Sequence, residues 1–251
     1  SERRLLFKQC KVFVLLPEYL GIFFLVLYFQ TGAVCPLSAD PFHREVAEGN
    51  LDSVRRFLAK NPILATMNDE LGRSPLHLAV INGQHAMINV LINAGADVNA
   101  VDGLKKFMPL HYAAFYSYPK ILEFLLIRRA DILAQDVDGN LPLHFAAANG
   151  SPATVKILLE NNSGPDCLNN NWQTPLHMAA AALDNHQSFP AASKDERDYL
   201  EVAKLLLQAG ATPGIHDIWR NLPETIAWRK DHHSTFPRRF EELMRQLGRT
   251  R

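Results

Sequence analysis

One short motif recurs along this chain at a nearly constant interval and limits the folds open to it. Proline is followed two residues later by histidine at five places, which start at Pro41, Pro75, Pro109, Pro142 and Pro175. These prolines are 34, 34, 33 and 33 residues apart, and a sixth copy with threonine in place of histidine starts 48 residues further on, at Pro223. A fixed period of roughly 20 to 50 residues is typical of stacked supersecondary units. We therefore predict a repeat solenoid over residues 40–251.

Every unit of the repeat carries the same helix signals. Proline is favoured in the first helical turn, and the alanines behind it, as at residues 146–148, let a neighbouring helix approach closely. A turn and a second, leucine-rich stretch follow, which ends at a glycine or asparagine suited to a left-handed cap. Arg129 holds that cap position in the third unit, so we expect a weaker cap there. The pattern predicts two short helices per unit.

Two of these motifs resemble the ankyrin repeat. The letters SPLH at 74–77 and TPLH at 174–177 are similar to its tetrapeptide, and AGADVNA at 94–100 is similar to its loop. The resemblance covers residues 40–251 and implies an all-α solenoid of helix pairs, joined by projecting β-hairpin fingers, with a concave face. About six units are expected, over residues 40–69, 70–102, 103–136, 137–169, 170–217 and 218–251. The tetrapeptide lacks its first hydroxyl residue at Met108, Leu141 and Leu222.

The first 39 residues do not belong to this pattern. An apolar run over residues 12–29, interrupted at 17–18, follows four basic residues: Arg3, Arg4, Lys8 and Lys11. Its unbroken part is shorter than the roughly 20 residues of a membrane span, and a basic flank before a short apolar core is typical of a secretory signal. Three interpretations stay open: a cleaved signal, an uncut membrane anchor over residues 12–34, or a hydrophobic helix packed on a longer protein. We expect an exported or membrane-associated protein, with a cytoplasmic location as the alternative.

The composition and motifs give no case for catalysis or nucleic-acid binding. The chain has 26 basic and 26 acidic residues, whereas nucleic-acid binding needs a concentrated basic surface. Its three cysteines match neither a disulfide framework nor a zinc-binding spacing. Nucleophile-elbow, phosphate-loop and dinucleotide motifs are missing from the sequence. Five of the ten histidines hold the repeat position, where they cannot converge on one ion and are expected to bond turn backbone. We expect no enzymatic activity, no cofactor and no metal site.

The resemblance implies a protein partner that lies across the finger tips and the exposed side of the first helices. Aromatic residues stand out there, because interface hot spots are enriched in Trp and Tyr. Phe115 and Tyr116 replace small residues, and Trp172 replaces a finger glycine, so we predict a patch centred on these three and Phe107. An alternative is that the rings pack sideways and only tighten the stack. The predicted contact residues are Arg73, Ile81, Lys106, Phe107, Phe115, Tyr116, Tyr118, Asp138, Asn140, Asn171, Trp172 and Gln173.

Further expectations complete the hypothesis of a monomeric binding scaffold. The fifth unit holds an insertion over residues 183–199, in which a capping box at 193–196 predicts a helix start near residue 194. Residues 91–99 resemble the segment that asparaginyl hydroxylases accept in ankyrin proteins, which would make Asn99 a modification site. The main alternative function is a regulatory or targeting module within a larger membrane protein or multidomain enzyme.

Overall fold

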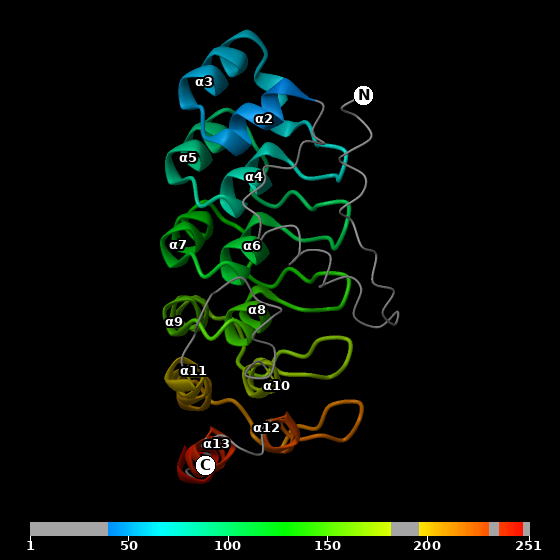
Figure 1. Ribbon diagram of the computed structural model, residues 1–251, viewed down its shortest axis with the longest axis vertical. Coiled ribbons are helices and arrows are strands. Elements are labelled where there is room, and N and C mark those ends of the chain that lie inside the picture. The colour runs from blue at the N-terminus through cyan, green and yellow to red at the C-terminus, as the bar shows by residue number, and fades with distance from the viewer. Residues whose placement is uncertain (1–39, 182–195, 231–235, 248–251) are drawn as a thin grey trace, which may run out of the picture. The chain divides into compact units, whose positions relative to one another are not determined.

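Six pairs of α-helices follow one another along the described part of the chain and form a stack (Figure 1). The computed structural model describes residues 40–181, 196–230 and 236–247, all within one compact unit. The pairs are α2 (Pro41–Glu48) with α3 (Leu51–Lys60), α4 (Pro75–Ile81) with α5 (His85–Asn93), α6 (Pro109–Phe115) with α7 (Pro119–Ile127), α8 (Pro142–Ala148) with α9 (Pro152–Glu160), α10 (Pro175–Ala181) with α11 (Glu196–Gln208), and α12 (Pro223–Lys230) with α13 (Phe236–Leu247). A short 3-10 helix, η3 (Pro62–Thr66), follows α3. The predicted all-α solenoid of about six units is confirmed.

The first helices of successive units lie side by side in one layer, and the second helices form the other (Figure 1). In α4, α6 and α8 all seven residues are buried. Alanines such as Ala113 and Ala146, both fully buried, leave room for the neighbouring helix. The second helices bury one stripe each, for example Val155 and Leu158 of α9. A single unit cannot bury these faces, so the stack is stabilised by contacts between neighbours.

Four of the five repeat histidines, those from His77 onward, join their unit to the next. His144 Nδ1 accepts the Leu141 backbone N–H at 3.0 Å, so Nε2 carries the proton and donates to the Gln173 carbonyl of the following unit at 3.0 Å. His77 makes the same pair of bonds, to Ser74 at 3.0 Å and Phe107 at 2.9 Å. The predicted scaffold role of these histidines is thus confirmed, and the bond from the backbone N–H persists at Leu141, where the hydroxyl is missing.

Burial keeps these imidazoles neutral. Desolvation lowers the pKa of His144 and of His111 to about 4 in each case, against 6.5 for a free imidazole. In the sixth unit Thr225 takes the place of histidine, and its hydroxyl accepts the Leu222 N–H at 2.8 Å. Threonine therefore reproduces the local bond but is too short to reach beyond its own unit.

Tight turns, called fingers here, project from one side of the stack between successive units (Figure 1). Each finger is closed by a backbone hydrogen bond, as from Asp69 N–H to the Arg73 carbonyl at 2.8 Å. The described residues contain no regular strand. The β-hairpins implied by the resemblance are therefore reduced to turns, because each finger is only five or six residues long.

Several predictions fall on residues outside the described ranges. These are the signal or anchor over 1–39, the insertion loop and the capping box before residue 196. Helix α11 is described from Glu196 onward and has 13 residues, against nine in α9. None of the helices among the described residues is long and apolar enough to span a membrane.

Candidate protein-binding surface

The five fingers share one local hydrogen-bonding pattern. They comprise residues 69–73, 102–107, 136–140, 169–173 and 217–221, numbered one to five. Each begins with Asp or Asn, whose side chain accepts backbone N–H groups of its own turn. In finger one, Asp69 Oδ1 accepts from Leu71 at 2.9 Å and from Arg73 at 2.8 Å. In finger five, Asp217 Oδ1 accepts from Trp219 at 3.0 Å. Asp and Asn suit this position because their short side chains reach the N–H groups of their own turn.

A line of backbone hydrogen bonds links each finger to the next. The donor is always the second residue of a finger, and the acceptor is a carbonyl near the tip of the preceding one. The four bonds are Gly103 to Leu71 at 3.2 Å, Val137 to Lys105 at 3.0 Å, Asn170 to Asp138 at 2.9 Å, and Ile218 to Asn171 at 3.1 Å. The finger tips therefore hold a fixed register relative to one another.

The residue three places before each repeat proline has a left-handed backbone. Its φ is +73° at Gly72 and +77° at Gly139, where glycine bears it freely, but +57° at Lys106, +58° at Trp172 and +60° at Arg220. A bulky side chain in this region is a genuine outlier. Conformational strain of this kind costs about 1–3 kcal/mol and clusters at functional sites. Trp172 is the strongest case, and its side chain is 61% exposed.

Each finger also presents an apolar side chain to solvent. We call this set the finger-tip row. Its exposed fractions run from 38% to 61%, and it comprises Leu71, Leu104, Val137, Trp172, Ile218 and Trp219. Single exposed apolar residues are ordinary, but a contiguous set marks an interaction surface. The row was missed by sequence reasoning except at Trp172. Its members lie three to five residues before the repeat proline of their finger, at no single offset.

The aromatic patch predicted from the sequence is wrong at two of its four members. Phe107 and Phe115 are 6% and 5% exposed. Phe107 stacks on His111 with ring centres 5.5 Å apart and packs edge-on against Phe145 of the next unit at 5.0 Å. Ile81 and Asn140, at 8% each, are likewise buried rather than available to a partner. At these positions the sideways packing considered as an alternative is the correct one.

Tyr116 and Tyr118 stack within the third unit, and Tyr118 also packs against the preceding unit. Their rings stack at 5.9 Å, and Tyr116 lies over Tyr112 at 6.4 Å. Burial raises the pKa of both phenols above the usual value. A methyl group on Gly83 of the preceding unit would lie 3.3 Å from the Tyr118 ring. The ring of Tyr118 therefore packs against Gly83, in the turn of the preceding unit.

The remaining predicted contact residues lie on the fingers. Trp172 and Lys106 are exposed, as is Asp138, which pairs with Lys105 at 3.4 Å. Half-buried positions are held by Arg73, which pairs with Asp69 at 2.7 Å, and by Asn171 and Gln173. The structure thus leaves the predicted finger residues accessible except Phe107 and Asn140, and it buries Ile81 and Phe115 on the first helices.

Two further groups with possible chemistry are accounted for by packing. Cys167 Sγ lies 3.9 Å from His144 Nδ1, but burial raises the pKa of the thiol to about 12. A thiol that stays protonated beside an imidazole of pKa about 4 is a poor nucleophile. The Asn99 side chain accepts the Asp131 N–H at 2.8 Å and so bridges to the next loop. Its hydroxylation remains a prediction.

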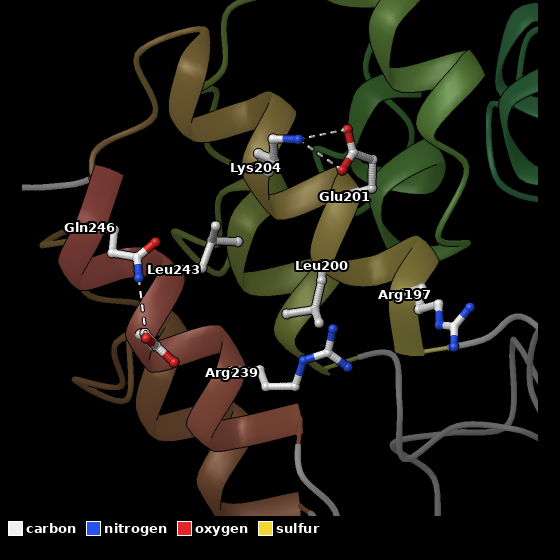
Figure 2. A pocket seen from close by; sticks show the side chains of 8 residues that line it. Arg197, Leu200, Glu201, Lys204, Arg239, Leu243 and Gln246 are labelled. Carbon is white, nitrogen blue, oxygen red and sulfur yellow. Dashed lines mark hydrogen bonds and ion pairs between the residues drawn. The ribbon is translucent and has the colours of Figure 1, made fainter.

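A groove of about 420 Å³ lies between the second helices α11 and α13 (Figure 2). Leu200 and Leu243 line it together with charged side chains. Lys204 pairs with Glu201 at 3.2 Å, and Arg239 pairs with Glu196 at 3.0 Å. Since these charges compensate one another, the groove offers a weaker attraction to a partner than the exposed row on the fingers.

A stack of helix pairs with a registered row of exposed fingers defines the class of repeat proteins that act as interaction modules. Comparison with known families agrees: the family described as "Ankyrin repeats (3 copies)" matches residues 25–102, 42–136 and 110–217. The chain belongs to the ankyrin-repeat family.

Three curated relatives show similarity over part of this chain. Inversin of Homo sapiens is 30% identical over 100 residues, which are 40% of this chain and 9% of inversin. Protein phosphatase 1 regulatory subunit 27 of Homo sapiens is 34% identical over 101 residues, 40% of this chain and 64% of the relative. Palmitoyltransferase AKR1 of Lachancea kluyveri is 34% identical over 112 residues, 44% of this chain and 15% of the relative. The chain therefore covers less than two thirds of each of them.

Proposed function

We propose that this chain is a non-enzymatic scaffold that holds a protein partner along its finger tips. The observation that carries the proposal is the finger-tip row: apolar side chains on all five fingers are exposed, and the largest sits on a strained backbone at Trp172. Large aromatic side chains dominate the energetics of protein interfaces. A partner that covers the row would bury the two exposed indoles of Trp172 and Trp219.

Photo-crosslinking in cells tests this function. A benzophenone amino acid is placed at Leu104 or Trp219 of the full chain, and separately at Ile127 of α7, which is 72% exposed but lies on a second helix. We expect a discrete crosslinked protein from the two finger positions and none from position 127. Equal crosslinking from all three positions, or none from the fingers, would refute the proposal.

A regulatory or targeting module within a longer enzyme is the second candidate. It is favoured by one observation: the similar segment forms only 15% of palmitoyltransferase AKR1 and 9% of inversin. Under this candidate the finger-tip row would contact another part of the same polypeptide. Intact-mass measurement of the native protein tests it, because a species much heavier than 28.2 kDa supports the module and a species of this mass or less refutes it.

We also propose export or membrane association, on the strength of the basic and apolar residues before residue 40. Cell fractionation with N-terminal sequencing tests this location. An intact N-terminus in the soluble cytosol would contradict it. The monomeric state is a separate prediction, for which sedimentation of the purified chain is the measurement.

A further inference from the structure

Three large side chains stand at the tips of fingers four and five: Trp172, Trp219 and Arg220. We call them the tryptophan–arginine cluster. Resting on the function proposed above, we infer that this cluster binds a short segment of the partner in which an acidic side chain stands next to a large apolar one. The support comes from the position of the three residues, from the groups that they leave unpaired, and from the difference between these fingers and the other three.

The turns of two adjacent fingers hold the cluster together. Trp172 and Arg220 each lie three places before the repeat proline, so they occupy corresponding positions on their fingers. Both have a left-handed backbone, with φ of +58° and +60°. The hydrogen bond from Ile218 N–H to the Asn171 carbonyl, 3.1 Å long, joins the residues directly before Trp219 and Trp172. One segment of a partner can therefore contact both indoles and the guanidinium.

The cluster leaves its contact groups unused in the chain alone. The indoles of Trp172 and Trp219 are 61% and 59% exposed, and Arg220 is exposed as well. Among the described residues, neither indole has an aromatic or cation–π contact, and Arg220 has no ion pair. The single acidic residue of these two fingers, Asp217, is 3% exposed, and its carboxylate accepts the backbone N–H groups of Trp219 at 3.0 Å and Asn221 at 2.8 Å. The guanidinium is therefore available to a carboxylate from outside the chain.

The first three fingers lack this combination. Their exposed apolar side chains are aliphatic rather than aromatic. Two of their cations have acidic partners, since Arg73 pairs with Asp69 at 2.7 Å and Lys105 pairs with Asp138 at 3.4 Å. Lys106 is the remaining cation, and its finger has no exposed aromatic side chain. The anchor of the partner is therefore expected at fingers four and five.

The chemistry of the cluster defines the segment. Tryptophan and arginine are enriched among interface hot spots, where apolar side chains of the partner cover them. A guanidinium pairs with a carboxylate through two parallel N–H···O bonds. Because Trp219 and Arg220 are consecutive, the apolar and the acidic side chain should be close neighbours in the segment.

Two other charged ligands fit the cluster less well. Sites for phosphorylated segments use clusters of arginine, whereas fingers four and five hold one cation, Arg220. Indoles attract cations through their ring faces, but the positive charge of Arg220 would repel a cationic ligand at the neighbouring finger. A single carboxylate matches the single guanidinium.

Selection from a displayed peptide library tests the inference without a known partner. The probe is a library of random peptides on phage, panned against the full chain. We expect enrichment of sequences in which Asp or Glu stands next to Phe, Leu or Trp, or one residue away. A consensus that lacks an acidic residue, a consensus of basic residues, or no enrichment would overturn the inference.

Matched variants connect the selected peptide to the cluster. Trp172→Gly introduces the residue that fingers one and three hold at this position and relieves the left-handed backbone. We expect its melting temperature to hold or rise, while affinity for the selected peptide, measured by fluorescence anisotropy, falls at least about tenfold. Arg129→Gly relieves the same kind of backbone, at φ +65°, on the α7 cap and should leave affinity unchanged. If Trp172→Gly binds the selected peptide as the parent does, the inference fails.

A charge exchange tests the guanidinium separately. Arg220→Glu should weaken binding of the acidic peptide at least about tenfold and should favour the same peptide with lysine in place of its acidic residue. Arg129→Glu makes the same charge change at an exposed, left-handed residue away from the fingers and should alter neither affinity. An unchanged preference in Arg220→Glu would overturn the inference.

Two further measurements separate this inference from the function on which it rests. Self-association of the purified chain that Trp172→Gly abolishes in sedimentation would assign the cluster to a second copy of the chain and overturn the inference. Crosslinking from Leu104 on finger two does not depend on the cluster, so it would still be seen if only the inference is wrong. Loss of crosslinking from both Leu104 and Trp219 would instead refute the scaffold function.

Discussion

The buried histidines make the stability of this stack depend on pH in a way that can be worked out. His111 and His144 are fully buried, and desolvation lowers the pKa of each to about 4. In the unfolded chain both return to about 6.5. Above pH 6.5 both are neutral in either state, and stability has its full value. As pH falls below 6.5, both histidines become protonated in the unfolded chain, whereas in the folded chain they stay neutral until about pH 4. The free energy of unfolding therefore decreases as pH falls from 6.5 to 4.

The magnitude follows from the size of the shift. Lowering the pKa from 6.5 to about 4 corresponds to about 3.4 kcal/mol per histidine, or about 7 kcal/mol for the pair. Between about pH 6 and pH 4.5 these two histidines should lower the free energy of unfolding by about 2.7 kcal/mol per pH unit, since two protons contribute about 1.4 kcal/mol each. Burial also lowers the pKa of His77 and of His177, so these histidines add to the slope. A typical domain has only about 5–15 kcal/mol of stability. The stack should therefore unfold as pH 4 is approached.

Urea titrations followed by circular dichroism at pH 7.5, 6.5, 5.5 and 4.5 measure this slope. His144→Gln is the informative variant, because glutamine can accept the Leu141 N–H and donate to the Gln173 carbonyl but does not titrate. It should lower stability at pH 7.5 by about 1–2 kcal/mol and reduce the slope by about 1.4 kcal/mol per pH unit, the contribution of one proton. An exposed control, His85→Gln, should change neither. A flat profile between pH 6.5 and 5, or a slope unchanged in His144→Gln, would refute the reasoning.

Three further outcomes are expected from single contacts. Gly150→Ala should destabilise the chain by about 2 kcal/mol in urea unfolding, because φ is +54° and the new methyl group would lie 2.8 Å from the Tyr199 ring; a change under half of that would contradict the packing. Tyr112→Phe should lower stability by about 1.5–3 kcal/mol, since its hydroxyl donates to the buried Asp102 carboxylate at 2.7 Å. Cys167 should react with iodoacetamide at pH 8 far more slowly in folded than in urea-unfolded protein, and equal rates would show that the thiol is not protected.

The finger residues show where sequence reasoning worked and where it stopped. Trp172 was identified as a contact residue from its place in a glycine position, and it is exposed. Trp219 sits one place earlier on the next finger and was missed, because the fifth unit's insertion hides the alignment of that finger. The row residues lie three, four or five places before the repeat proline, so alignment on that proline does not by itself reveal the row.

The sequence by itself determined the repeat, its helix pairs and the role of its histidines. These depend on local signals, namely proline at a helix start, a cap after the second helix, and a histidine at a constant offset, so each unit reports them independently. Only the tertiary structure decided which aromatic residues a partner can reach. Phe107 is covered by Phe145, and the Gly83 turn by Tyr118, each from a unit more than 30 residues along the chain. In a solenoid the neighbouring unit decides whether an aromatic ring is buried, so the sequence of the ring's own unit does not predict its exposure.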